Sequence, residues 1–214
     1  MSVSPCKLFS YCGFNRQRIV RKMPKVIFIG DEERRLVKRL QEGDKSAARE
    51  FYALYADTMA GVCSRYIADE EDLKDVFQNA FIHIFTHIAE FKYLKAGSLE
   101  AWATKVVVNE SLKFLRTKKQ HEMLLMDDIL LDEVEEEFPS INEIPSDAIR
   151  EMLSRLPTGY RTILNLYVFE GKSHQEIARL LGIKKDSSAS QLHNARKMLT
   201  EMIRKYKKDN HSRR

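Results

Sequence analysis

Apolar residues recur at helical spacing along residues 31–66, which predicts two helices separated by a turn. Gly43 is expected to end the first helix, and the side chain of Asp44 to cap the second. The apolar stripes that define the pair are Leu36, Val37 and Leu40 in the first helix and Phe51, Leu54, Tyr55, Met59, Val62 and Tyr66 in the second.

Two further helices are predicted before residue 120. The acidic run "ADEED" at 68–72 places carboxylates in the first turn of the third helix, where they suit its dipole. After the break "EFKYLKAGS", Ser98 is expected to cap a fourth helix from Leu99 to about Lys118. The apolar positions of the third helix are Leu73, Val76, Phe77, Ala80, Phe81, Ile84, Phe85 and Ile88.

The second half of the chain starts with a segment that lacks the helical pattern of apolar residues. Residues 119–147 contain two prolines and a block of like charge, which is typical of a flexible linker. Four more helices follow, in "SDAIREMLSRL", "PTGYRTILNLYVFEG", "SHQEIARLLG" and a long final segment. The predicted fold class is therefore all-α, with an N-terminal helical bundle and a C-terminal helix-turn-helix joined by a flexible acidic linker.

Five segments follow from these patterns. We expect a basic, disordered extension at 1–30, a first domain at 31–119, the linker at 120–147, a second domain at 148–206 and a basic tail at 207–214. Residues 1–22 lack the apolar core of a secretory signal. They are a flexible basic arm, a segment upstream of a true start at Met23, or a transit peptide.

Charge is unevenly distributed along the chain, although its net value is only +5. Residues 121–149 carry ten Asp or Glu and no Lys or Arg, whereas both flanking segments are basic. Basic segments of this kind favour a polyanionic partner, the alternative being a solvated surface. Cys6, Cys12 and Cys63 are odd in number and lack metal-ligand spacing, and no apolar run reaches membrane-spanning length. These features predict reduced thiols, a cytoplasmic location and no membrane insertion.

The stretch 173–199 has the pattern of a helix-turn-helix. Ser173 and Glu176 form the S-x-x-E of a capping box, and Gly182 permits the turn that Ile183 plugs. The inward face of the second helix is assigned to Ser188, Leu192, Ala195, Leu199 and Met202, and the outward face to Asp186, Ser190, His193, Asn194, Lys197 and Arg204. Such a polar, basic face suits a DNA major groove, although an ordinary helix pair with a solvated face would share the pattern.

Taken together, these motifs resemble the extracytoplasmic-function (ECF) group of bacterial RNA polymerase sigma factors. The run "LKDVFQNAFIHIF…GSLEAWATKVVVNESLKFLRTKK" resembles the domain that grips polymerase and opens the minus-ten promoter element. The run "LPTGYRTILNLYVFEGKSHQEIARLLGIKKDSSASQLHNARKML" resembles the domain that reads the minus-thirty-five element. The resemblance implies a factor that binds core polymerase (its largest-subunit clamp and its flap) and promoter DNA, and such factors often have an anti-sigma partner.

The resemblance also implies roles for particular residues. The D-x-x-Q-x-x-F pattern assigns polymerase docking to Asp75, Gln78 and Phe81, although the side chain of Phe81 is expected to pack within the domain. Contacts to the minus-ten element fall on Lys92, Tyr93, Lys95, Trp102, Lys105, Asn109, Lys113, Arg116, Lys118 and Lys119. Contacts to the minus-thirty-five element fall on Lys185, Ser187, Ser190, Gln191, His193, Asn194, Arg196 and Lys197. Trp102 admits two interpretations, a core residue or a surface for base stacking.

Other functions fit the sequence less well. His83 and His87 have the i, i+4 spacing of zinc ligands, but no third ligand is evident, and the acidic run lacks the apolar framework of a two-metal nuclease. We therefore expect no cofactor, no metal and no enzymatic activity. An autonomous helix-turn-helix repressor or activator is the main alternative function, and a helical protein–protein adaptor is a third.

Overall fold

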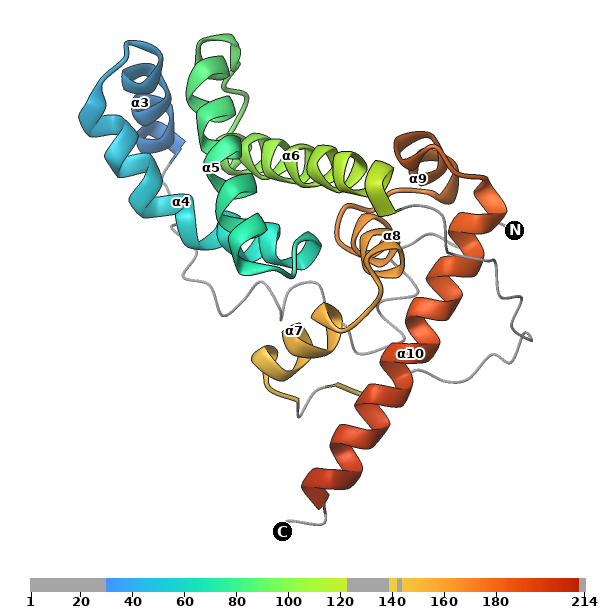
Figure 1. The fold of residues 1–214 in the computed structure, drawn as a ribbon. Helices are drawn as coiled ribbons and strands as arrows, with labels where there is room; N and C mark the ends of the chain where they lie inside the picture. The colour runs from blue at the N-terminus through green and yellow to red at the C-terminus, as the bar shows by residue number, and fades with distance from the viewer. Residues whose placement is uncertain (1–29, 123–138, 142–143, 212–214) are drawn as a thin grey trace. The chain divides into compact units, whose positions relative to one another are not determined.

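The structure, a computed structural model, describes residues 30–122, 139–141 and 144–211, and every regular element within these ranges is helical (Figure 1). The chain divides after Glu122 into two compact units, as the predicted all-α, two-domain class requires. The predictions for the N-terminal extension, for most of the acidic linker and for the end of the basic tail concern residues outside the described ranges.

The N-terminal domain is built from five helical elements. They are α3 (Gly30–Gln41), α4 (Lys45–Tyr66), α5 (Glu70–His87), the short 3-10 helix η1 (Ile88–Glu90) and α6 (Ser98–Glu122). Helix α4 packs against α3, α5 and α6, and α5 packs against α6. The predicted apolar stripes of α3 and α4 are buried except at Leu54, which is half-buried. Helix α6 extends to Glu122, into the segment assigned to the linker.

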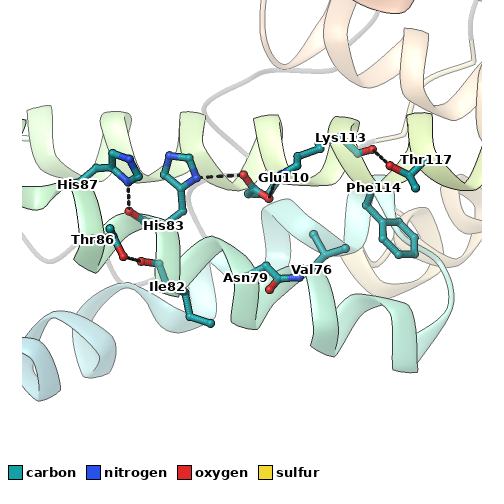
Figure 2. A pocket seen from close by; sticks show the side chains of 10 residues that line it. All are labelled: Val76, Asn79, Ile82, His83, Thr86, His87, Glu110, Lys113, Phe114 and Thr117. Carbon is teal, nitrogen blue, oxygen red and sulfur yellow. Dashed lines mark hydrogen bonds and ion pairs between the residues drawn. The ribbon is translucent and has the colours of Figure 1, made fainter.

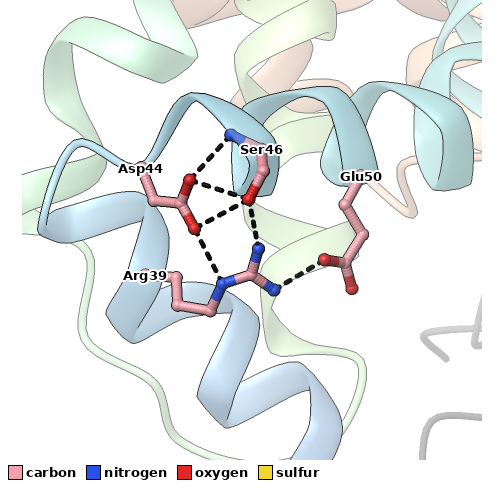
Figure 3. A network of polar contacts seen from close by, with 4 residues as sticks. All are labelled: Arg39, Asp44, Ser46 and Glu50. Carbon is pink, nitrogen blue, oxygen red and sulfur yellow. Dashed lines mark hydrogen bonds and ion pairs between the residues drawn. The ribbon is translucent and has the colours of Figure 1, made fainter.

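The turn from α3 to α4 is fixed by a polar network (Figure 3). Asp44 is the N-cap of α4 and accepts a hydrogen bond from the Ser46 backbone N–H at 2.7 Å, as predicted. Arg39 joins the two helices, because its guanidinium donates to Asp44 at 2.9 Å and to Glu50 at 2.7 Å. Hydrogen bonds from Ser46, and then from Arg39, lower the pKa of Asp44 to about 2. The preceding Gly43 has a φ of +78°, which suits glycine at a helix end.

The N-terminus of α6 is capped differently from the prediction. Ser98 is the first residue of α6 and its hydroxyl accepts from the Leu94 N–H at 3.4 Å. The backbone N–H groups of Gly97 and Leu99 instead donate to the carboxylate of Glu33 on α3, at 2.6 and 2.8 Å. The expectation of a Ser98 side-chain cap is therefore wrong, because a carboxylate from a distant helix occupies that place. A negative charge there also suits the positive end of the helix dipole.

The C-terminal domain contains α7 (Ser146–Ser154), α8 (Thr158–Val168), α9 (His174–Leu181) and α10 (Lys185–His211). Helix α10 packs against the other three, and α8 packs against α9. The core between them includes Ile163, Leu166, Ile177, Ala195 and Ile203. Burying these side chains positions the short helix α9 against the long helix α10, which is the helix pair that the sequence predicted.

Candidate nucleic-acid and polymerase interfaces

The outward face of α5 combines polar and apolar side chains. Asp75 and Gln78 are exposed, as their proposed docking role requires. Ile82 and Phe85 continue the same helical stripe and remain 58% and 37% exposed. Large apolar groups beside a carboxylate and an amide form a surface suited to a protein partner.

Phe81 lies beneath this face and does not contribute to it directly. Its ring is buried and packs edge-on or tilted against Phe51, Tyr52, Phe77 and Phe85, with ring centroids 4.8 to 6.0 Å apart. Phe81 is therefore not a direct docking contact, because the α4–α5 aromatic core covers it, and its expected packing role is confirmed. Phe81 instead supports the exposed rings of Tyr52 and Phe85.

The loop between η1 and α6 presents cations around an apolar tip. Lys92 and Lys95 are exposed, while Tyr93 is half-buried. Burial, and then the nearby Glu33 carboxylate, raise the pKa of Tyr93. Leu94, which the sequence reasoning passed over, is 82% exposed. Leu94 is thus an apolar side chain exposed to solvent between two lysines. In this it resembles the apolar wedges that DNA-binding proteins place between or against bases.

Four of the polar residues assigned to the minus-ten element form a stripe along α6. Lys105, Asn109, Lys113 and Arg116 are all exposed, and their spacing places them on one side. Lys118 does not join this stripe. It lies on the opposite side of α6, where its ammonium contacts the Asp72 carboxylate of α5 at 2.5 Å. The side chain of Lys119 lies outside the described residues.

Trp102 lies at the start of this stripe and is half-buried. Its indole packs at a tilt against the ring of Phe91, with centroids 5.1 Å apart. The structure thus gives it a packing role at the base of the loop and leaves part of its surface open to solvent.

A groove of about 450 Å³ separates the outer faces of α5 and α6 (Figure 2). The rings of His83 and His87 stack there, 4.2 Å apart. His83 Nδ1 donates to the Glu110 carboxylate at 3.1 Å, and His87 Nδ1 donates to the His83 carbonyl oxygen at 2.9 Å. No group of three or more potential metal ligands occurs within the described residues. His83 is thus hydrogen-bonded to Glu110 of α6, and His87 to the backbone of its own helix α5.

The helix-turn-helix corner has the predicted local geometry. Ser173 and Glu176 form a complete capping box at the start of α9, and Gly182 ends α9 in the left-handed conformation with a φ of +67°. A further contact joins the two helices, since His174 Nδ1 lies 3.0 Å from the hydroxyl of the fully buried Ser188. Burial, and then the charge of Lys185, lower the pKa of His174.

Most of the residues assigned to minus-thirty-five reading lie on accessible parts of α10. Lys185 and Lys197 are exposed, and the partly exposed ones are Ser187, Ser190, Gln191, His193 and Arg196. Asn194 is the exception, since it is only 6% exposed and its amide donates to the Tyr160 hydroxyl of α8 at 3.2 Å. Its assignment to the outward face is wrong, because α8 packs over that side of α10.

Sequence reasoning missed Ile82, Phe85 and Leu94 as surface residues and Glu33 as a cap. Ile82 and Phe85 fall within an apolar run, where the pattern alone does not distinguish a core position from an exposed one. Leu94 did carry a signal, since it is an apolar residue between Lys92 and Lys95 in a break of the helical pattern. Among the residues that the structure describes, no helix is both long and apolar enough to cross a bilayer.

Two protein families match the chain, in the order in which the two domains occur. Residues 51–121 match the family described as "Sigma-70 region 2", and residues 146–199 match "Sigma-70, region 4".

Several curated proteins are similar over most of their own length. The ECF RNA polymerase sigma factor SigW of Bacillus subtilis is 24% identical over 179 residues, which cover 78% of this chain and 95% of that protein. The ECF RNA polymerase sigma-E factor of Escherichia coli K12 is 25% identical over 179 residues, covering 78% and 92%. The sigma factor SigZ of Bacillus subtilis is 29% identical over 142 residues, covering 65% and 77%.

Two solved structures are also similar. CnrH in complex with the cytosolic domain of CnrY shares 19% identity with a TM-score of 0.43, covering 79% of this chain and 96% of that one. RpoE in complex with the anti-sigma factor NepR from Bartonella quintana shares 15% identity with a TM-score of 0.43, covering 73% and 96%.

Proposed function

This chain belongs to the ECF group of sigma-70 factors and is an RNA polymerase sigma factor; from that premise we propose which of its surfaces bind core polymerase and which bind promoter DNA. The observation that carries the proposal is the occurrence of both sigma-70 regions in one chain, each with exposed side chains of matching chemistry. Core polymerase and promoter DNA are the partners, and the cytoplasm is the site of action. The chain performs no catalysis of its own, and an anti-sigma factor is a candidate regulator.

Docking on core polymerase is assigned to the outward face of α5. Asp75 and Gln78 offer a charge and an amide, and Ile82 and Phe85 offer apolar surface that a partner would remove from water. An interface of this composition gains specificity from its polar pair and affinity from its apolar groups.

Opening of the minus-ten element is assigned to the loop at 91–97 and to the α6 stripe. Lys105, Lys113 and Arg116 offer a track for the phosphate backbone, while Asn109 offers an amide to a base edge. Leu94 supplies an apolar tip for an unstacked base.

Reading of the minus-thirty-five element is assigned to the accessible side of α10. Gln191 and Ser190 offer hydrogen-bonding groups to base edges, and Lys185, Arg196 and Lys197 offer charge to phosphates or guanine. Simultaneous contact at two promoter elements strengthens binding because the second contact forms within an existing complex.

The decisive experiment is gel filtration with core polymerase, followed by transcription in vitro from a genomic library with mapping of start sites. We expect stoichiometric co-elution and core-dependent initiation. An autonomous repressor or activator would bind a DNA site tightly without polymerase, usually as a dimer on a two-fold site. That outcome, without affinity for core enzyme, would refute the proposal.

The docking face is tested by Asp75→Arg. Reversing an exposed charge at the proposed interface should weaken core binding at least tenfold, since like-charge contacts cost several kcal/mol. The matched control is Asp57→Arg, an exposed carboxylate on α4, which should leave core binding within about twofold because charges outside an interface contribute little. Normal co-elution of Asp75→Arg would remove the docking assignment.

A further inference from the structure

We propose that Glu33 and Gln41, both on α3, are positioning residues that hold the loop at 91–97 in the conformation that reads the minus-ten element. The inference rests on the proposed function of that loop, and it assigns a role in DNA reading to a helix that does not itself carry any of the predicted DNA contacts.

The C-terminal end of the loop is held by a buried carboxylate. Glu33 is 0% exposed, and its two oxygens each accept one backbone N–H, from Gly97 at 2.6 Å and from Leu99 at 2.8 Å. Both donors belong to the group at a helix start that has no partner within the helix. A charged acceptor makes these bonds stronger than neutral ones. Glu33 therefore fixes where the loop ends and where α6, with its polar stripe, begins.

The N-terminal end of the loop is held by Gln41, the last residue of α3. The side-chain amide of Gln41 donates to the carbonyl oxygens of Ile88 at 3.2 Å and Phe91 at 2.8 Å. The Phe91 ring also packs against Trp102 of α6. The backbone is thus tied down on both sides of the segment that contains Lys92, Leu94 and Lys95.

Fixing the ends leaves the middle of the loop exposed and pre-formed. Leu94 remains 82% exposed although its backbone N–H is held by the Ser98 hydroxyl at 3.4 Å. A loop that is ordered before binding avoids the loss of chain entropy when a base arrives. Discrimination between bases also requires contact groups held to within a fraction of an ångström by the residues that support them.

The electrostatics of Tyr93 agree with this arrangement. After burial, the Glu33 carboxylate is the largest cause of its raised pKa. The phenol of a residue in the middle of the loop therefore lies within the field of the same carboxylate that caps α6.

The first test is hydrogen exchange in the free chain, which requires neither polymerase nor DNA. Glu33→Gln keeps the shape of the side chain but leaves one acceptor oxygen for two N–H donors, so the Gly97 and Leu99 amides should exchange about tenfold faster. Glu32→Gln is the matched control, because it removes an exposed carboxylate from the neighbouring position of α3. Unchanged exchange in Glu33→Gln would overturn the proposed anchoring.

The second test measures base discrimination by the holoenzyme. Single-stranded oligonucleotides would carry the minus-ten sequence obtained from start-site mapping, or the same sequence with one base changed. In Glu33→Gln the affinity ratio between matched and changed oligonucleotides should fall about tenfold, whereas core binding stays within twofold. A purely structural role would lower core binding and leave this ratio unchanged, which would overturn the proposal.

Gln41→Met gives an independent readout if Glu33→Gln fails to fold. Gln41 is exposed, and methionine keeps the length of the chain while removing both amide donors. The ratio should again fall, by about threefold, since these are neutral hydrogen bonds. A wild-type ratio in Gln41→Met would overturn the proposal. Failure of the wild-type chain to bind core polymerase would instead refute the proposed function, while the exchange experiment would still test the anchoring.

Discussion

The two parts of this chain that we propose to read DNA are held in shape by contacts between residues at very different separations in the sequence. In the C-terminal corner, Ser173 and Glu176 cap one helix within a span of three residues, and the Gly182 N–H closes the same helix on Ala178. In the N-terminal domain, the loop at 91–97 is held by Gln41 and Glu33, whose partners lie 47 to 66 positions away. The corner is therefore encoded by its own sequence, whereas the loop depends on a helix from the other end of its domain.

The largest expected effect tests whether the corner is stable independently of the N-terminal domain. Ile177→Ala empties a fully buried site and should lower the free energy of unfolding of the C-terminal domain by about 3 kcal/mol. The N-terminal domain should unfold as before. Trp102 is the only tryptophan, so its fluorescence follows the N-terminal domain alone, while circular dichroism follows both.

Leu180→Ala is the matched control for this variant. Leu180 lies on the same helix but is 40% exposed, so its truncation should change stability by less than about 1 kcal/mol. If Ile177→Ala shifted the fluorescence transition as much as the circular dichroism transition, the two domains would not be independent and the comparison would fail.

A smaller effect is expected at the turn of the corner. An added Cβ at Gly182 would meet no atom within 4 Å, so only the left-handed backbone opposes Gly182→Ala. The expected loss in unfolding free energy is about 1–2 kcal/mol, the cost of that conformation for an ordinary residue. Chemical denaturation would measure it, with Gly182→Asn as the control that should lose less. An equal loss in both variants would show that the φ angle is not the cause.

Two lysines of α6 test whether the polar stripe of the N-terminal domain faces promoter DNA. Lys113 belongs to the exposed stripe and lies 3.7 Å from the Glu110 carboxylate of its own helix, whereas Lys118 is paired with Asp72 of α5 on the opposite side of the helix. Lys113→Ala should reduce the slope of log affinity against log salt for holoenzyme binding to promoter DNA by about 1. Lys118→Ala should leave that slope unchanged. Equal slopes in the two variants would show that the stripe is not the DNA-facing side.

The smallest effect concerns the contact between His174 and Ser188. Because the pKa of His174 is lowered in the folded chain, the unfolded chain binds more protons once the pH falls below about 6.5. The stability of the C-terminal domain should therefore be complete above that pH and decline as the pH falls toward the folded pKa. Denaturation between pH 7 and pH 5 would show this decline, and His174→Gln should remove that part of it.

The separation in sequence between contacting residues also explains which features could be predicted from the sequence and which could not. The Asp44 cap, the Ser173–Glu176 capping box and the Gly182 turn were predicted because each depends on neighbouring residues. The Ser98 cap was predicted wrongly because nothing near residue 98 indicates that Glu33 lies there.

The misassigned surface residues have the same origin. Helical spacing places Asn194 away from the apolar stripe of α10, but burial was decided by Tyr160 of α8. Phe81 fits a docking motif, yet rings from α4 and from its own helix cover it. Periodicity describes one helix at a time, so it locates a face without revealing which neighbour covers it.

The reactivity of the Cys63 thiol can report on the opening of the N-terminal domain. It is fully buried, its pKa is raised by burial, and the Ser111 hydroxyl lies 3.8 Å from its sulfur. A protonated, enclosed thiol reacts slowly with oxidants and alkylating reagents. Modification at this position would therefore follow the loss of packing between α4 and α6 and report how often these helices separate in solution.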